Sequence, residues 1–372
     1  MMPASVSSLA DGSHAGGLPS TRESTLPVAK KRVVAGVAMC VVVGAAGFFL
    51  LQPRVPDGPL ATRLTWLVEQ AASASQFSGV VLVARNGAVV FAQAEGRVST
   101  DGPLVTVDSR FPIASLSKVF TSVAILQSIQ AKQLSPDDTL AEIFPSLSGS
   151  AAGAVTIHQL LTHTSGIEEV ISRDSSRRIT PDDLRTAVIE PTSFEYSNTG
   201  YVCLALVLEK LTGMPFADVV KERVLAPAGM TDSGLLRRSE GADDLVRGDG
   251  ATRAPADWKF EVEAIEGAGS VYSTPRDLVR FDRALAAGVL LSTASLELMT
   301  AAHVPGRYAY GWMLGEQGGI PYTWHSGDLP GFSTYMARVP ARGEVVLVLS
   351  NRSGADVRGL ARQMLRQLRR PD

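Results

Sequence analysis

Cysteine, aromatic residues and an excess of either charge are scarce in this sequence. The 372 residues include two cysteines, Cys40 and Cys203, too few for a disulfide scaffold or a cysteine-based zinc module. Aromatic residues make up 6%, and 35 basic side chains stand against 37 acidic ones, for a formal net charge of −2. Nucleic-acid binders carry a strongly basic surface, so this balance excludes nucleic acid as a partner. The five histidines form no HExxH-like pair, and we expect no metal site.

Apolar residues, by contrast, are plentiful. They make up 45% of the chain against 19% charged residues, enough for a large core and too little charge for general disorder. No second linker rich in proline, glycine or serine divides residues 60–372, so we expect one large domain there. Cys203 is expected to be a free, buried thiol within it.

The N-terminal region predicts a membrane anchor. Residues 1–32 form a disordered tail that ends in three basic residues, and residues 33–51 are an uncharged apolar run. As a helix this run spans roughly 28 Å, close to the ~30 Å hydrocarbon core of a bilayer. It ends without a small-residue cleavage site, so we expect an uncleaved transmembrane helix followed by a linker over 52–59.

The charges that flank the apolar run predict its orientation. Three basic residues precede it and Arg54 alone follows it, which places the N-terminus in the cytoplasm and the domain outside that membrane. In a Gram-negative bacterium the domain would be periplasmic. The alternative is a cytoplasmic enzyme in which residues 33–51 form a core helix.

Local patterns in residues 60–372 predict an α+β fold. Two β-rich runs, 79–84 and 88–93, flank an Asn-Gly turn, which is a strong hairpin signal. Residues 332–339 and 344–350 are typical of paired strands. Helical spacing lies between these strands and again over 356–369, so we expect an antiparallel sheet with helices.

The first motif with chemical potential is Ser115-Leu-Ser-Lys118, a single Ser-x-x-Lys. If a helix starts at Ser115, the two side chains share a face and can meet. A buried lysine can lose its charge and accept the serine proton, and an N–H at a helix start can hold an oxyanion. Alone, the motif is more often a capping serine with a solvated lysine.

Two further motifs follow. In Tyr196-Ser-Asn198, a phenol beside an ammonium becomes easier to ionise and can relay a proton, while the amide fixes the lysine and a carbonyl. In His325-Ser326-Gly327-Asp328, the histidine is a partly charged group that faces substrate, and glycine on an edge strand admits a ligand backbone. Alone, each is an ordinary turn, before a helix and between strands respectively.

Together, the three motifs occur in a familiar order, among stretches that fit the same pattern: Phe111–Ser115, Leu160–Gly166, Gly269–Thr274 and Tyr310–Trp312. Over about residues 60–370 the chain resembles the serine β-lactamases and penicillin-recognising hydrolases. The resemblance is strongest to their class C-like branch, with its esterases and D-stereospecific peptidases, because the second motif is Tyr-Ser-Asn rather than the Ser-Asp-Asn of class A. It implies a β-lactamase/transpeptidase-like fold, a sheet flanked by helices plus a mostly helical lobe, and no organic cofactor.

The resemblance also implies roles for these residues. Ser115 would be the acylated nucleophile, Lys118 and Tyr196 would move its proton, and Asn198 would orient substrate. The third motif, His325 to Asp328, would line the site, with the N–H groups of Ser115 and Asp328 as the oxyanion hole. His163 belongs to the family pattern too, and we expect it to hold a loop rather than to act as a base.

The third motif departs from the family's usual lysine. Histidine is a weaker anchor for the carboxylate of a β-lactam, so D-amino-acid peptides and small esters are the preferred substrates. No acidic residue stands out for deacylation. We therefore expect a membrane-anchored serine hydrolase acting on a small-molecule or peptide substrate; the alternative is a catalytically silent binding module on the same scaffold. Residues 237–263 are either a specificity loop near the cleft or an inert surface loop.

Overall fold

The computed structural model describes residues 54–74, 76–172, 177–190, 192–237, 245–248 and 262–371. Residues Val55–Asp372 form one compact unit. The predicted tail and transmembrane helix lie outside the described residues, as does most of 237–263. Among the described residues, no helix combines the length and apolar character needed to cross a bilayer.

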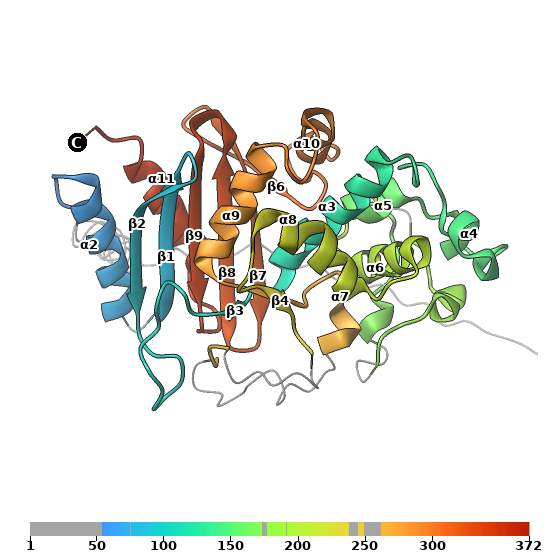
Figure 1. Cartoon of the computed structure of the whole chain (residues 1–372), viewed down its shortest axis with the longest axis horizontal. Coiled ribbons are helices and arrows are strands. Elements are labelled where there is room, and N and C mark those ends of the chain that lie inside the picture. The colour runs from blue at the N-terminus through green and yellow to red at the C-terminus, as the bar shows by residue number, and fades with distance from the viewer. Residues whose placement is uncertain are drawn as a thin grey trace, which may run out of the picture. The chain divides into compact units, whose positions relative to one another are not determined.

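The centre of the described unit is an antiparallel sheet in the order β2-β1-β9-β8-β7-β6. Its strands come from both ends of the domain: β1 (Gly79–Arg85), β2 (Ala88–Glu95), β6 (Met313–Gln317), β7 (Ile320–Leu329), β8 (Phe332–Val339) and β9 (Glu344–Ser350). β1 pairs with β9, with Gly79 opposite Ser350. The first and last parts of the domain therefore close one sheet (Figure 1).

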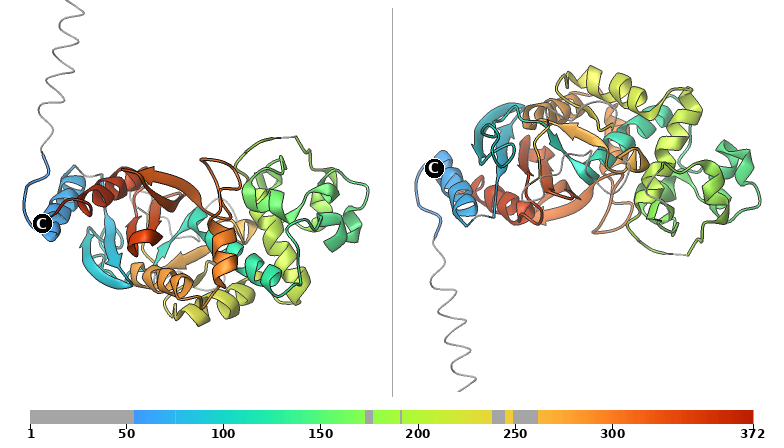
Figure 2. Two further views of the ribbon diagram at one scale, coloured as in Figure 1. Left: turned by 90° about the horizontal axis from the view of Figure 1, so that it is seen from above. Right: turned by 90° about the horizontal axis from the view of Figure 1, so that it is seen from below.

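Helices cover both faces of this sheet. On one face lie α2 (Leu60–Ser73) and α11 (Val357–Gln367), whose apolar side chains share a core with alternate residues of β8 and β9. On the other face, α9 (Pro275–Ala286) packs against β1 and β9. The two views in Figure 2 show the sheet between these helical layers. The alternation of inward side chains along each strand produces this arrangement.

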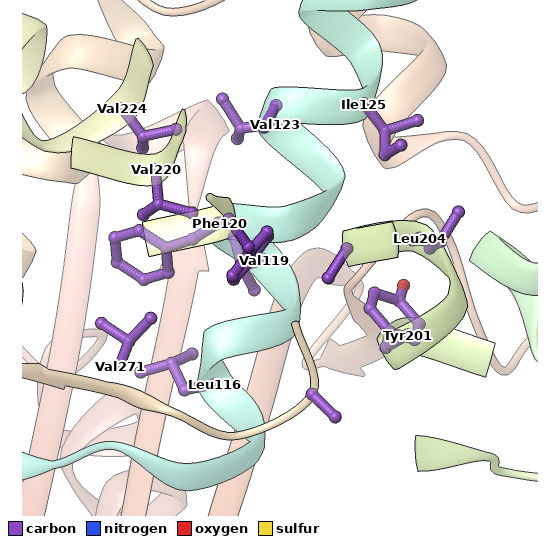
Figure 3. Packing of buried hydrophobic residues seen from close by; sticks show 14 of the residues in the cluster. Leu116, Val119, Phe120, Val123, Ile125, Tyr201, Leu204, Val220, Val224 and Val271 are labelled. Carbon is purple, nitrogen blue, oxygen red and sulfur yellow. The ribbon is translucent and has the colours of Figure 1, made fainter. Parts of the chain in front are cut away.

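The central helix of the second layer is α3 (Ser117–Gln130). Eleven of its 14 residues are buried, which is why its sequence is apolar or small all round rather than on one face. It packs against α6 (Asn198–Thr212) and α7 (Phe216–Val220). In Figure 3, Phe120 of α3 lies against Val220, and Leu116 lies beside Val271. α3 is thus held on every side.

The remaining elements are short helices and a small second sheet. The helices are α4 (Leu140–Ile143), α5 (Ile157–Thr162), α8 (Ala226–Ala228) and α10 (Thr293–Thr300), and a small second sheet in the order β3-β5-β4 contains β3 (Phe111–Pro112), β4 (Gly234–Leu235) and β5 (Val271–Ser273). The chain passes from β3 through the 3-10 turn η1 (Ala114–Leu116) directly into α3.

The structure confirms much of the predicted α+β fold. The Asn-Gly turn has φ of 52° at Asn86 and 75° at Gly87, the backbone that a two-residue hairpin needs. The strands predicted over 332–339 and 344–350 are β8 and β9. Cys203 is a buried free thiol, and burial raises its pKa to about 12. One detail was wrong: the α-helix begins at Ser117, and Ser115 lies in the preceding 3-10 turn.

Candidate active site

Ser115 is presented by a strained elbow between β3 and α3. The preceding residue, Ala114, has φ of 51°, a left-handed backbone that a residue with a Cβ rarely adopts. Contacts of η1 with β7 and β8 hold this conformation. The Ser117 hydroxyl at the start of α3 also accepts the backbone N–H of Val271, 2.9 Å away. The half-buried Ser115 side chain therefore sits on a rigid support.

Lys118 lies one turn beyond Ser115 and is completely buried. Its Nζ is 3.1 Å from Ser115 Oγ, 2.8 Å from Asn198 Oδ1 and 2.8 Å from the backbone oxygen of Ala268. Burial lowers the pKa of this amine from 10.5 to about 7, although the charge of Glu169 raises it in part. At neutral pH a substantial fraction of Lys118 is therefore uncharged.

The three partners of Lys118 decide where its lone pair points. The oxygens of Asn198 and Ala268 have no proton to give, so each must accept an N–H from the amine. The Ser115 hydroxyl does have a proton. When Lys118 is neutral, its two N–H bonds face the fixed oxygens and its lone pair faces Ser115, which is the geometry of a general base.

Tyr196 and Asn198 reach this site from the start of α6. Between them, the Ser197 hydroxyl accepts the Gly200 N–H and caps the helix. Tyr196 therefore precedes the cap, and Asn198 is the first residue of the helix. The Tyr196 hydroxyl hydrogen-bonds the Ser115 side chain, and Lys118 Nζ lies 4.8 Å from the centre of its ring. All four residues of the first two motifs therefore meet in one hydrogen-bonded group.

The protonation of Tyr196 differs from the expectation. A neighbouring ammonium was expected to ease its ionisation, but burial raises the pKa of the phenol above its ordinary value of 10. The charges of Glu169 and Asp328 act in the same direction. Tyr196 therefore rests as a proton donor, and Lys118 is the group that titrates near neutrality.

The third motif lies within β7 rather than in a turn between strands. His325 is 2% exposed; its Nδ1 is 2.6 Å from the Ser326 backbone oxygen and its Nε2 is 3.3 Å from the Tyr308 hydroxyl. Burial, assisted by the charge of Lys118, lowers the pKa of His325 to about 3. The expectation of a partly charged histidine was wrong: His325 is neutral at pH 7, because its burial and the charge of Lys118 both disfavour the imidazolium. Its ring centre lies 6.3 Å from that of Tyr196.

Gly327 was expected to let a ligand backbone approach β7, but the backbone that approaches it is that of Ile113 in the same chain. A Cβ at this position would lie 2.2 Å from the Ile113 backbone oxygen and 2.9 Å from the Ala114 Cβ. Only the second half of β7 is the expected edge strand. β6 pairs with β7 as far as Trp324, and residues 325–329 pair with β8 alone. Along this free edge Ser326 is half-buried and Asp328 is exposed.

Two residues support the site from α5 and the loop that follows it. His163 is buried with φ of 58°; its Nδ1 accepts the Ser197 N–H at 3.0 Å, and its backbone oxygen accepts the Glu195 N–H. It thus holds the Tyr196 loop, as expected. Glu169 binds the start of α6, with Oε1 2.6 Å from the Asn198 N–H. Sequence reasoning missed Glu169; its only signal was a carboxylate in a loop beside a family stretch.

Metal ligands do not gather here. In the described ranges, no group of three or more histidine, cysteine, aspartate or glutamate side chains is arranged to hold a metal ion. The chemistry of the cluster is that of a hydroxyl beside an uncharged amine.

Comparisons with known proteins agree with this geometry. The profile of the family described as Beta-lactamase matches residues 65–369. Penicillin-binding protein 4* of Bacillus subtilis (strain 168) is 32% identical over 78% of this chain and 71% of its own length. The structure of a penicillin-binding protein from Bacillus halodurans has a TM-score of 0.68 at 26% identity and covers 82% of this chain and 98% of its own. The D-amino acid amidase of Ochrobactrum anthropi SV3, complexed with D-phenylalanine, has a TM-score of 0.70 at 25% identity and covers 83% and 98%.

Gly327→Ala is expected to impair both stability and the site. The added methyl group collides with the Ile113 carbonyl and must displace η1 from β7, at about 1–3 kcal/mol of unfolding free energy. Chemical denaturation measures this loss. The control is Gly200→Ala in α6, where the new methyl group would meet its neighbours at an ordinary 3.7 Å. Equal stability of the two variants would contradict the tight packing of η1 against β7.

Proposed function

The chain belongs to the Beta-lactamase family of serine hydrolases, and on this premise we propose that it cleaves an ester or amide through an acyl-enzyme on Ser115. The observation that carries the proposal is the buried Lys118 amine. It lies 3.1 Å from Ser115 Oγ, and burial lowers its pKa to about 7. A base with this pKa next to a hydroxyl is suited to generating a nucleophile at neutral pH.

In the first half-reaction, Ser115 Oγ attacks the carbonyl carbon and its proton passes to Lys118. Asn198 and the Ala268 carbonyl hold the resulting ammonium. The bond to the leaving oxygen or nitrogen then breaks. Tyr196, which bonds the same serine oxygen, gives its proton to the leaving group and recovers one from Lys118. The products are the acyl-Ser115 ester and the free alcohol or amine.

In the second half-reaction, water attacks the acyl carbon. One proton of the water passes to Lys118, and Ser115 recovers a proton from Lys118, directly or through Tyr196, as the acid leaves. The oxyanion in both steps would accept from the N–H groups of Ser115 and Asp328, since Ser115 lies in a helical turn and Asp328 follows Gly327 on the free edge of β7.

The site is best suited to substrates whose binding does not depend on a carboxylate group. The neutral, buried His325 offers no cation to anchor a carboxylate such as that of a β-lactam. Similarity to penicillin-binding proteins and to a D-amino acid amidase supports D-amino-acid peptides or amides, with small esters next and β-lactams after them. The proposal also retains the membrane anchor over 33–51, which rests on the apolar run and its flanking charges alone.

Labelling of Ser115 tests the acyl-enzyme. We expect a fluorescent serine-directed phosphonate to add one adduct to the full-length chain, as read by intact mass, because Ser115 is the activated hydroxyl. Ser115→Ala and Lys118→Ala should each abolish the adduct and the turnover of an ester substrate while the fold persists by circular dichroism. Failure of the folded wild-type chain to react would favour the catalytically silent binding module. A persistent adduct with fluorescent penicillin would instead indicate a penicillin-binding peptidase.

The rate should depend on pH through Lys118. Because the neutral amine is the base, kcat/KM should rise about tenfold per pH unit below pH 7 and level off above it. Tyr196 should add no alkaline decline below pH 10, since burial raises its pKa. Rates from pH 5 to 10 on an ester whose leaving group does not titrate provide the check. A flat profile from pH 5 to 8 would remove Lys118 from the role.

Tyr196→Phe should lower kcat by a factor of at least about 10², the usual effect of losing a positioned proton donor. The ring and its contact with Lys118 are retained in this variant, so the loss reports the hydroxyl. Tyr272→Phe, a phenol on β5 outside the cluster, is the matched control and should keep the wild-type rate. A Tyr196→Phe enzyme of near-normal rate would show that another group protonates the leaving atom.

A further inference from the structure

Glu169 lies in the loop after α5 and binds the first turn of α6. Its carboxylate accepts three hydrogen bonds from the first turn of α6. Oε1 takes the Asn198 N–H at 2.6 Å, and Oε2 takes the Thr199 N–H and the Thr199 hydroxyl, both at 3.2 Å. A carboxylate at a helix N-terminus is favourable because it satisfies unpaired N–H groups and meets the positive end of the dipole.

The residue that Glu169 holds is the one that holds Lys118. The Asn198 backbone N–H binds Glu169, while its side-chain oxygen accepts from Lys118 Nζ at 2.8 Å. A change in the position of the first turn of α6 therefore moves one of the two fixed oxygens that orient the amine. Ser197 caps this helix through the Gly200 N–H, and Glu169 takes the N–H groups of Asn198 and Thr199.

The charge of Glu169 also acts on the Lys118 amine. Lys118 is surrounded by hydroxyls, phenols, an amide, a backbone carbonyl and two uncharged imidazoles: Ser115, Tyr196, Tyr201, Asn198, Ala268, His163 and His325. Each of these is neutral near pH 7. Glu169 is the acidic group whose charge acts on Lys118 and favours the protonated amine.

We propose that Glu169 is a positioning residue for the hydrolysis proposed above: it fixes Asn198 against Lys118 and supplies the negative charge that stabilises the Lys118 ammonium formed when Ser115 attacks. The proposal rests on that proposed function for its role in catalysis. The coupling of Glu169 to Lys118 is a property of the folded protein and is measurable without turnover.

Direct titration of Lys118 tests the coupling. The chain contains seven lysines, so selective 13C labelling at Cε gives a spectrum simple enough to assign with a Lys118→Ala variant. In the full-length Glu169→Gln variant, the Lys118 resonance should titrate at a lower pH than in the wild type, because removal of the opposing charge disfavours the ammonium. An unchanged or higher midpoint overturns the proposal.

The neighbouring residue provides a matched control. Glu168 is half-buried and its Oε1 accepts the Val188 N–H at 2.6 Å, so Glu168→Gln removes one carboxylate charge from a backbone contact of the same kind. It should leave the Lys118 midpoint unchanged, since Glu168 is not among the groups that act on Lys118. An equal shift in both variants would reduce the effect to net charge and overturn the specific role.

Kinetics then separate positioning from structure. Glu169→Gln should lose about fivefold in plateau kcat, the effect of one hydrogen bond, and the acid limb of its rate profile should move to lower pH. Glu169→Asp keeps the charge but has a shorter side chain. The acid limb of its rate profile should therefore stay near the wild-type pH while its plateau kcat falls. If Glu169→Gln does not fold, Glu169→Asp provides the test. A plateau kcat equal to that of the wild type in this variant would overturn the positioning role. A wild-type chain that hydrolyses nothing while the midpoint still shifts refutes the proposed function and leaves the coupling standing.

Discussion

The burial of the Lys118 amine is the constraint on which the site depends. Removing a charged ammonium from water costs free energy. A lysine with no exposed surface must therefore either form hydrogen bonds that offset this cost or lose its proton. Here both occur. Two fixed oxygens take its N–H bonds, and burial brings its pKa close to neutrality. The fold therefore produces a base from a residue that is ordinarily an acid.

The helix α3 is what makes this burial possible. It is covered on every side, and it begins directly after the strained turn that carries Ser115. The turn is pressed against β7 at Gly327, so the main sheet fixes the nucleophile, while the start of α6 and the residue before its cap supply Asn198 and Tyr196. The neutral state of His325 follows from the same packing, since its burial disfavours the charged imidazolium.

Local chemistry explains which features were predictable. The hairpin around Asn86-Gly87 and the strands β8 and β9 are encoded in alternation and turn residues, which act over a few positions. The Ser115–Lys118 pair is a local spacing as well. The charge of His325 and the role of Glu169 are different in kind, because they depend on what packs against them from distant segments. Lone glutamates in loops are common, and no sequence pattern marks the one that reaches a helix start. The third motif was expected on an edge strand, with a turn as the alternative for the motif taken alone, and it lies where β7 extends beyond its pairing with β6.

The pairing of β1 with β9 has a consequence for how the protein is made. Residues 79 and 350 lie side by side, so the central sheet cannot close until residue 350 has left the ribosome. Contacts so distant in sequence form slowly, and the incomplete sheet exposes its edges meanwhile. The strand that presses on the Ser115 turn, β7, is also synthesised long after the turn itself. The nucleophile is therefore positioned only after β7 has been made, and a chain truncated before β7 would lack the support that positions it.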